Sequence, residues 1–367
     1  MQPEKAVKYF EYALKSAIKN LGAEHHGTSN AYNNLGMASM SMGDYGSAIG
    51  YFEKALSNYL EIDPAGTSVS ALYNNLGMAY DNQGKYNESI RYYKQSLSLG
   101  LKTYGAQHPE VATNYNNLGL AYANVNDGQR AIAYLEKAFE IYISNLGEKH
   151  PKVGLALMNI GDVYERNGAL DKALEAYQAA LSVYVGTFGE THSQSLYLYS
   201  AMGRVYANLG MNQDAIAMRE KELACKMKVH GANHPVLFDT YYELAMSHQN
   251  SGQHETAIEF FGQAMQLCEP SPEPPLDYRI TLVRDRIAFS QNKMGRYRLA
   301  IGLFKKVIQS KIAKLGPKHE DLAFSHHFLA SSYLGIDDFD NALSSNKHAL
   351  AINLSKYGEY GDEILAT

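Results

Sequence analysis

The sequence contains few cysteines and no long apolar run. Only Cys225 and Cys268 occur among 367 residues, which excludes a disulfide framework or a cysteine-rich zinc module and indicates a reducing compartment. No apolar run approaches the ~20 residues that span a bilayer, and residues 1–10 form a charged, amphipathic start. We therefore expect a cytoplasmic protein without membrane insertion or a signal peptide.

Positive charge is also scarce. The chain carries 33 Lys and Arg side chains against 38 Asp and Glu, a net charge of −5, and no run of basic residues exceeds two. Without a basic patch, nucleic-acid binding is not expected. The sequence also lacks a Gly-x-x-x-x-Gly-Lys phosphate loop, a Gly-x-Gly-x-x-Gly dinucleotide turn and a Gly-x-Ser-x-Gly nucleophile elbow. We expect neither enzyme activity nor a cofactor.

What the sequence does contain is a repeat. A small residue recurs in steps of 41 to 43 residues, at Gly36, Gly77, Gly119, Gly161, Gly203, Ala245, Ala288 and Ala330. A second small residue follows twelve positions later in each unit, at Ala48, Ser89, Ala131, Ala173, Ala215, Ala257, Ala300 and Ala342. Eight units in nearly constant register indicate a repeat protein with two close-packing points per unit.

Each unit has the pattern of two amphipathic helices. Apolar residues are three or four positions apart in both halves, as at Leu118 and Tyr122 and then at Leu135 and Phe139. Glycine is placed for the turn between the halves at Gly43, Gly84, Gly168, Gly210, Gly252 and Gly295. Glycine also ends the second helix at Gly105, Gly147, Gly189, Gly231 and Gly316. One helix face remains uncovered within a unit, so neighbouring units must stack. The predicted fold is all-α, a solenoid of stacked antiparallel helix pairs.

These motifs resemble the tetratricopeptide repeat, lengthened from 34 to about 42 residues. The lengthened form with Gly-x-x-His-Pro at its junctions, as at residues 105–109, is similar to the kinesin light chain repeat. The resemblance covers essentially the whole chain. It implies a right-handed superhelix without catalytic activity that binds partner proteins.

The resemblance and the register together divide the chain as one solenoid over residues 1–367. The predicted repeats are 23–63, 64–105, 106–147, 148–189, 190–231, 232–269, 270–316 and 317–356, preceded by the second helix of a truncated repeat at 3–22 and followed by the start of a further repeat at 357–367. Because both ends fall within a repeat, we expect a piece of a longer protein. A stiff junction is predicted at the prolines of residues 270–275, where the period changes to 43.

The repeat family implies that the first helix of each unit lines a concave groove. The residues that map to this groove, or lie at its edge, are Asn33, Met37, Met40, Asn74, Met78, Asp81, Asn116, Leu120, Asp162, Arg166 and Arg204. Asparagine can donate to and accept from the main chain of an extended peptide, and methionine forms adaptable apolar pockets. Arg166 and Arg204 could pair with an acidic ligand. We expect an extended segment of a protein partner as the ligand.

Two other repeated residue types favour structural roles. The second asparagine of each pair, at positions 34, 75 and 117, is interpreted as a bond to a neighbouring helix. Histidine recurs at His25, His108, His150, His192, His234 and His319. Equivalent positions are one layer apart, too far for shared coordination at ~2.1 Å, so helix capping is favoured and no metal site is expected.

Three functions fit this sequence. The first is a non-catalytic scaffold that captures a peptide in its groove, as kinesin light chains capture adaptor peptides with an aromatic residue flanked by acids. The acidic Asp81 and Asp162 depart from a groove for such a ligand. The second is a sensor or autoinhibitory arm of a larger signalling protein with a nucleotide-switch or protease domain. The third is a spacer that self-associates end to end. For the groove, Asn74→Ala with Asn116→Ala is expected to weaken capture by about 1–3 kcal/mol with little change in melting temperature.

Overall fold

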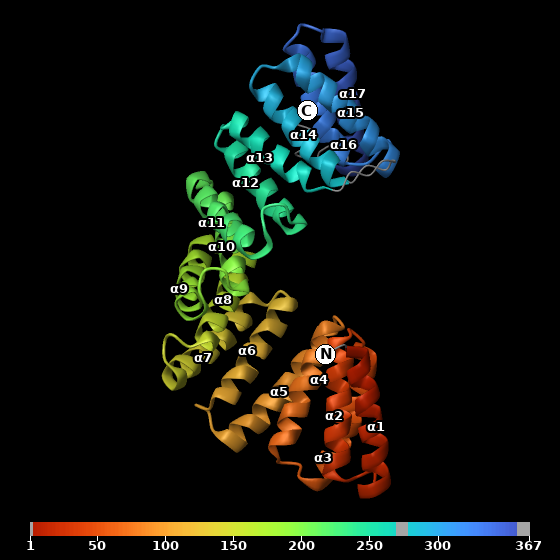
Figure 1. Cartoon of the computed structure of the whole chain (residues 1–367), viewed down its shortest axis with the longest axis vertical. Helices are drawn as coiled ribbons and strands as arrows, with labels where there is room; N and C mark the ends of the chain where they lie inside the picture. The colour runs from red at the N-terminus through yellow and green to blue at the C-terminus, as the bar shows by residue number, and fades with distance from the viewer. Residues whose placement is uncertain (1–2, 269–277, 358–367) are drawn as a thin grey trace. The chain divides into compact units, whose positions relative to one another are not determined.

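The computed structural model describes residues 3–268 and 278–357 (Figure 1). Over these residues the regular structure is α-helical, apart from one 3-10 helix, and contains no strand. The predicted all-α fold of stacked antiparallel helix pairs is confirmed. The proline-rich junction at 270–275 and the start of a further repeat after residue 357 lie outside the described residues, and both stay predictions.

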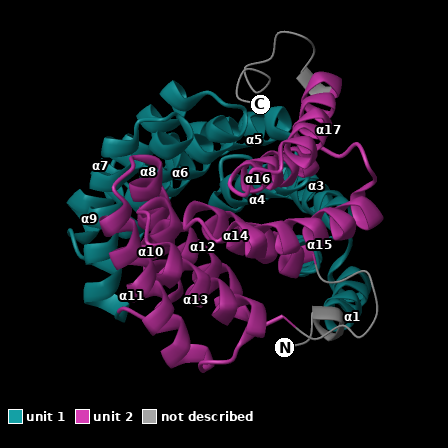
Figure 2. Cartoon of the chain, turned by 90° about the horizontal axis from the view of Figure 1, so that it is seen from above, with its two compact units in different colours: residues 1–189 teal, residues 190–367 magenta. Residues whose placement is uncertain are grey.

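The chain divides into two compact units, which Figure 2 distinguishes by colour. Unit 1 comprises residues 1–189. Its helices are α1 (Pro3–Leu21), α2 (His26–Ser41), α3 (Tyr45–Ile62), α4 (Thr67–Asn82), α5 (Tyr86–Tyr104), α6 (Pro109–Asn124), α7 (Gly128–Leu146), α8 (Pro151–Arg166) and α9 (Leu170–Phe188). The pairs α2/α3, α4/α5, α6/α7 and α8/α9 are the helical hairpins, and α2, α4, α6 and α8 also contact one another in succession. These four first helices are called the first-helix layer below.

Unit 2 comprises residues 190–367. Its helices are α10 (Ser193–Asn208), α11 (Asn212–His230), the 3-10 helix η1 (Pro235–Leu237), α12 (Phe238–Asn250), α13 (His254–Gln266), α14 (Tyr278–Lys293), α15 (Tyr297–Leu315), α16 (Asp321–Leu334) and α17 (Phe339–Tyr357). Its hairpins are α10/α11, α12/α13, α14/α15 and α16/α17. That all repeats form one continuous solenoid stays a prediction.

The turns within the hairpins have the backbone that the glycines predict. Gly43 and Gly84, between the two helices of their repeats, have φ of 76° and 77°. This left-handed conformation is strained for residues with a Cβ, and Asn and Asp tolerate it best after glycine. In two repeats the turn contains Asn126 or Asp337 instead, with φ of 58° and 60°. The same turn is therefore made in these repeats with a different residue.

The small-residue slots are points of close packing between the two helices of a repeat. A Cβ on Gly77 would lie 2.6 Å from the ring of Tyr93, and one on Gly161 would lie 2.5 Å from the ring of Tyr177. Both tyrosines are buried. The alanines of the second slot, such as Ala131, are fully buried as well. The sequence thus predicted both packing points correctly, because a side chain larger than these would separate the helices.

Five of the six periodic histidines cap the start of a first helix, whereas the side chain of His192 makes no such cap of α10. His25 Nδ1 accepts a hydrogen bond from the backbone N–H two residues later, at 3.0 Å. His108, His150, His234 and His319 make the equivalent bond at 3.1 to 3.3 Å. Each bond satisfies one of the backbone donors left open at the start of a helix. The capping role predicted for these five residues is confirmed.

Candidate functional site

The structure places ten of the eleven predicted groove residues on the first-helix layer of unit 1. Asn33, Met37 and Met40 lie on α2; Asn74, Met78 and Asp81 on α4; Asn116 and Leu120 on α6; and Asp162 and Arg166 on α8. The eleventh, Arg204, is exposed on α10 and belongs to unit 2. The candidate site therefore lies on unit 1 alone.

Asparagine side chains connect each first helix of unit 1 to the next. Asn75 Nδ2 donates to Asn33 Oδ1 at 3.0 Å, and Asn117 Nδ2 donates to Asn74 Oδ1 at 2.9 Å. The series continues between α6 and α8, where Asn159 Nδ2 donates a hydrogen bond to Asn116 Oδ1 at 2.8 Å. In each bond the second asparagine of one repeat contacts the first asparagine of the preceding repeat. The structural role predicted for Asn75 and Asn117 is confirmed, and these bonds are called the asparagine ladder below.

The ladder leaves different groups available at its three rungs. Asn33 and Asn74 are half-buried, and their Nδ2 groups have no hydrogen-bond partner within residues 3–268 and 278–357. Asn116 is only 5% exposed, accepts from Asn159 at 2.8 Å and donates to Asn117 at 3.3 Å. Asn116 thus anchors α8, and its contact with a ligand stays a prediction that requires this amide to turn outward.

Methionines and an aspartate follow the ladder along α2 and α4. Met37 is 43% exposed, whereas Met40 and Met78 are half-buried and pack against the apolar core clusters. Both Asp81 carboxylate oxygens accept from Asn124 Nδ2 of the next first helix, at 3.1 and 3.3 Å. Burial raises the pKa of Asp81, and the bond from Asn124 opposes that shift. Asp81 therefore links helices and also adds negative charge to this surface.

On α8 the charged residues surround a buried tyrosine. The hydroxyl of Tyr177 donates to Asp162 at 2.6 Å and lies 2.8 Å from Glu165. Burial and these two carboxylates raise the pKa of Tyr177. Arg166 is exposed at the end of the helix. The α8 end of the layer is therefore more acidic than basic.

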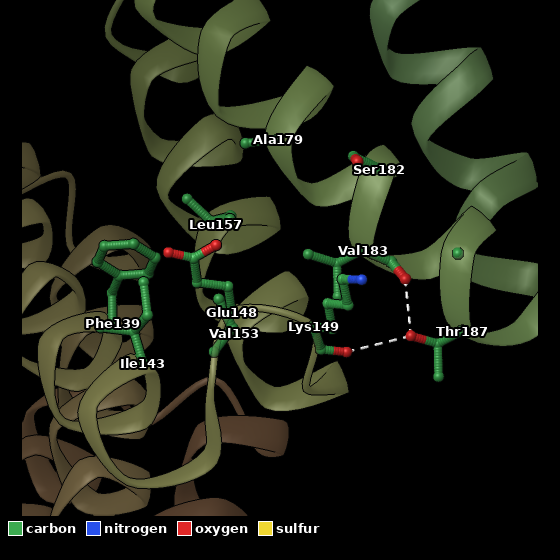
Figure 3. Close-up of a pocket in the computed structure, with 11 residues that line it drawn as sticks. Phe139, Ile143, Glu148, Lys149, Val153, Leu157, Ala179, Ser182, Val183 and Thr187 are labelled. Carbon is green, nitrogen blue, oxygen red and sulfur yellow. Dashed lines mark hydrogen bonds between the residues drawn. The ribbon is translucent and has the colours of Figure 1, made fainter.

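Sequence reasoning missed an apolar pocket on the other side of unit 1. The α7–α9 pocket has a volume of about 580 Å³, with Phe139 and Ile143 of α7 on one side, Val183 of α9 on the other and Leu157 of α8 between them (Figure 3). Figure 2 shows α7 and α9 on the outside of unit 1, with α6 and α8 further inside. The hydroxyl of Thr187 lies within hydrogen-bond distance of the Lys149 and Val183 carbonyl oxygens, at 3.1 and 2.8 Å, and connects α9 to the loop between α7 and α8.

The repeat register contains a signal for this pocket. Ala179, which lines it, occupies the position that holds Lys54, Lys137, Lys221 and Lys306 in other repeats. Ala176, which lines an adjoining depression, occupies the position of Tyr51, Tyr92 and Tyr134. In several other repeats these two positions hold lysine and tyrosine. With alanine at both, α9 lacks the side chains that cover the corresponding surface of the second helix in those repeats. Aligning the repeats position by position shows that both side chains are smaller here than in most other repeats.

The structure also bears on membrane and metal sites. Among the described residues, no helix is both long and apolar enough to cross a bilayer. In the same part of the chain, no three His, Cys, Asp or Glu side chains are grouped so that they could hold a metal ion.

Comparison with known proteins identifies the repeat. The family model of the tetratricopeptide repeat matches residues 1–61, 68–144, 124–184, 193–269 and 278–355. No curated protein matches the chain.

Several solved structures share the fold. BtubC from P. vanneervenii is 20% identical, with a TM-score of 0.55 over 63% of this chain and 93% of that protein. The C-terminal part of a TPR repeat-containing protein from Cytophaga hutchinsonii is 19% identical, with a TM-score of 0.54 over 79% and 97%. A putative kinesin light chain from Podosopora anserina with nearly identical TPR-like repeats is 24% identical, with a TM-score of 0.50 over 54% and 95%.

Proposed function

Because the chain belongs to the tetratricopeptide-repeat family, whose members generally mediate protein–protein interaction, we propose that it is a non-catalytic scaffold that binds an extended segment of a partner protein. The segment lies along the first-helix layer of unit 1. The protein acts in the cytoplasm, as its low cysteine content favours.

The asparagine ladder is the observation that carries this proposal. Asn33 and Asn74 are half-buried, and one amide donor of each has no partner in the part of the chain that the structure describes. Because the ladder holds their oxygens, their orientation is already fixed before a ligand binds, which lowers the entropic cost of binding. Neighbouring helices are ~8–10 Å apart and an extended chain advances ~3.3 Å per residue, so one rung meets about every third residue.

The surrounding side chains indicate the chemistry of the segment. Met37 and Met78 offer flexible apolar contacts to its side chains. The carboxylates of Asp81 and Asp162, and the acidic end of α8, disfavour a second negative charge. The proposed segment is therefore uncharged or basic, in contrast to an aromatic residue flanked by acids.

A peptide array probed with the full chain tests this function. For the peptides that bind, Met37→Glu and Asn33→Ala are expected to weaken affinity by about 5- to 30-fold, which corresponds to 1–2 kcal/mol. The matched control is Ala179→Lys, which fills the α7–α9 pocket with the residue that four other repeats have at this position. Capture that survives both first-helix variants would refute the proposed surface.

The α7–α9 pocket is a second candidate for partner binding. It is favoured by its apolar lining and by the small residues that replace lysine and tyrosine there. In the same experiment, loss of capture in Ala179→Lys with normal capture in Met37→Glu would assign the partner to this pocket.

A further inference from the structure

A small polar cavity of about 110 Å³ opens between α4, α5 and α6. Asn74 and Asn75, which belong to the asparagine ladder, line it together with Glu110. Its deeper wall consists of Ser70, Ser96 and Asn114. The cavity is therefore lined mostly by helices of the first-helix layer, and it shares two residues with the asparagine ladder.

The cavity exists because one tyrosine of the repeat is absent. In neighbouring repeats a tyrosine of the second helix bonds to the first helix: Tyr59 donates to Asn30 at 2.8 Å, and Tyr142 pairs with Thr113 at 3.0 Å. In the α4/α5 repeat, Gly100 and Ala71 occupy these two positions. A Cβ on Gly100 would lie 3.0 Å from Asn114 Nδ2, so the missing side chain opens space directly beside that amide.

The deeper wall is polar where most other repeats are apolar, although Thr240 and Ser325 occupy the position of Asn114 in two of them. Asn114 occupies the position of Leu72, Ala156 and Leu198, and it is only 6% exposed. The fully buried Ser96 bonds to its Oδ1 at 3.0 Å and so fixes the orientation of the amide. A buried polar group in a core position costs free energy unless it is hydrogen-bonded.

Four polar groups of this cavity have no hydrogen-bond partner among residues 3–268 and 278–357. Two are donors, Asn114 Nδ2 and Asn74 Nδ2. Two are acceptors, Asn75 Oδ1 and the Glu110 carboxylate at the rim. A ligand that satisfies all four must therefore both accept and donate hydrogen bonds.

We propose that this cavity binds the carboxamide of a glutamine or asparagine side chain. A carboxamide oxygen accepts from the two donors, and its NH₂ group donates to the two acceptors. An ammonium group has no acceptor and would leave Asn114 and Asn74 unsatisfied, whereas a carboxylate has no donor and would meet Glu110. The volume of about 110 Å³ is several times the ~10–15 Å³ that one water requires on the same measure, so it has room for the three heavy atoms of a carboxamide.

When a peptide is bound, the cavity selects a segment with glutamine or asparagine opposite α4 and α6. This selectivity rests on the function proposed above. The pocket itself can be tested without a peptide. Acetamide, acetate and methylammonium are small probes that carry a carboxamide, a carboxylate and a cation. Each is titrated into the ¹⁵N-labelled full chain, and the side-chain amide signal of Asn114 is followed by NMR.

Acetamide is expected to shift the Asn114 signal saturably, and acetate and methylammonium are expected to bind about tenfold more weakly or not at all because each loses hydrogen bonds. Two variants should abolish the effect. Asn114→Leu introduces the residue found at this position in α4 and α10 and also assigns the signal. Ala71→Leu fills the cavity from its rim while retaining Asn114. Asn87→Leu, which removes an exposed amide of α5 outside the cavity, is the control and should bind acetamide normally.

Helix content and melting of each variant are measured by circular dichroism, so that a folding defect is not mistaken for loss of binding. Equal, non-saturating shifts with all three probes, or saturable binding that persists in folded Ala71→Leu, would overturn the carboxamide site. Peptide capture without a preference for glutamine or asparagine, together with no acetamide binding, would refute the cavity and leave the proposed function intact. Acetamide binding without any peptide capture would refute the proposed function and leave the carboxamide site intact.

Discussion

Truncating Asn116 tests whether the asparagine ladder holds the first helices together. In the structure, its Oδ1 accepts from Asn159 at 2.8 Å and its Nδ2 donates to Asn117 at 3.3 Å. Asn116 and Asn159 are 5% and 6% exposed, so water cannot readily replace the lost partner. Asn116→Ala is therefore expected to destabilise unit 1, whereas sequence reasoning alone expected little change in melting temperature.

The magnitude follows from the groups left unpaired. A buried donor without a partner costs about 1–3 kcal/mol, and the amide of Asn159 is such a donor in Asn116→Ala. For a cooperative unit of 150–250 residues, 1 kcal/mol corresponds to roughly 2–4 °C. Unit 1 comprises residues 1–189, so the expected loss is about 2–12 °C in its melting temperature. Asn33→Ala should cost less, because Asn33 is half-buried and its partner remains accessible to water.

A double-mutant cycle with Asn159 separates the ladder bond from other effects of truncation. Urea unfolding of the full chain gives the free energies, and hydrogen exchange in α6 and α8 assigns the change to unit 1. Once Asn159 has been removed, Asn116→Ala should cost clearly less, with a coupling of about 0.5–3 kcal/mol. A coupling near zero, or unchanged exchange in α8, would show that the ladder contributes nothing to stability.

Three further predictions concern packing and charge. A methyl group added by Gly161→Ala would lie 2.5 Å from the Tyr177 ring, so we expect a loss of about 1–3 kcal/mol by urea unfolding; unchanged stability would contradict this packing. Lys311 and Asp285 form a buried ion pair at 2.7 Å, so Lys311→Met should lower the free energy of unfolding by about 3–5 kcal/mol. Adding Asp285→Leu removes the unpaired charge and should restore much of that stability. Equal losses in the single and double variants would argue against the pair. Burial lowers the pKa of His326 to about 4, so the unfolded chain binds a proton that the folded chain excludes between pH 6.5 and 4, and stability falls as pH is lowered through this range. His326→Gln should flatten that part of the pH profile of thermal unfolding, and an unaltered slope would exclude His326 as its cause.

The sequence by itself determined the features that repeat in one register. The small-residue slots, the turn glycines and the capping histidines each act within a hairpin or at a helix end. Because their partners lie a few residues away or in the next helix, periodicity alone identifies them. The family and the fold class followed from the same positions.

Tertiary structure decided which of the predicted groove residues are available to a ligand. Asn33 and Asn116 have the same place in the repeat, yet one is half-buried and the other is held between two neighbours. Asn116 differs in being buried and in donating to Asn117 through its Nδ2, whereas both residues accept a hydrogen bond from an asparagine of the following repeat, 42 or 43 positions away. Local sequence carries no information about such a contact until the distance between helices is known.

Both cavities depend on side chains that are smaller than their counterparts elsewhere in the chain. Gly100 and Ala179 are ordinary residues in the printed sequence, and a missing side chain leaves space only where three helices surround it. The sequence therefore determined the repeat and its helices, because these follow from local spacing. Only the tertiary structure determined where the stacked helices leave room for another molecule, because volume and hydrogen-bond satisfaction depend on several repeats at once.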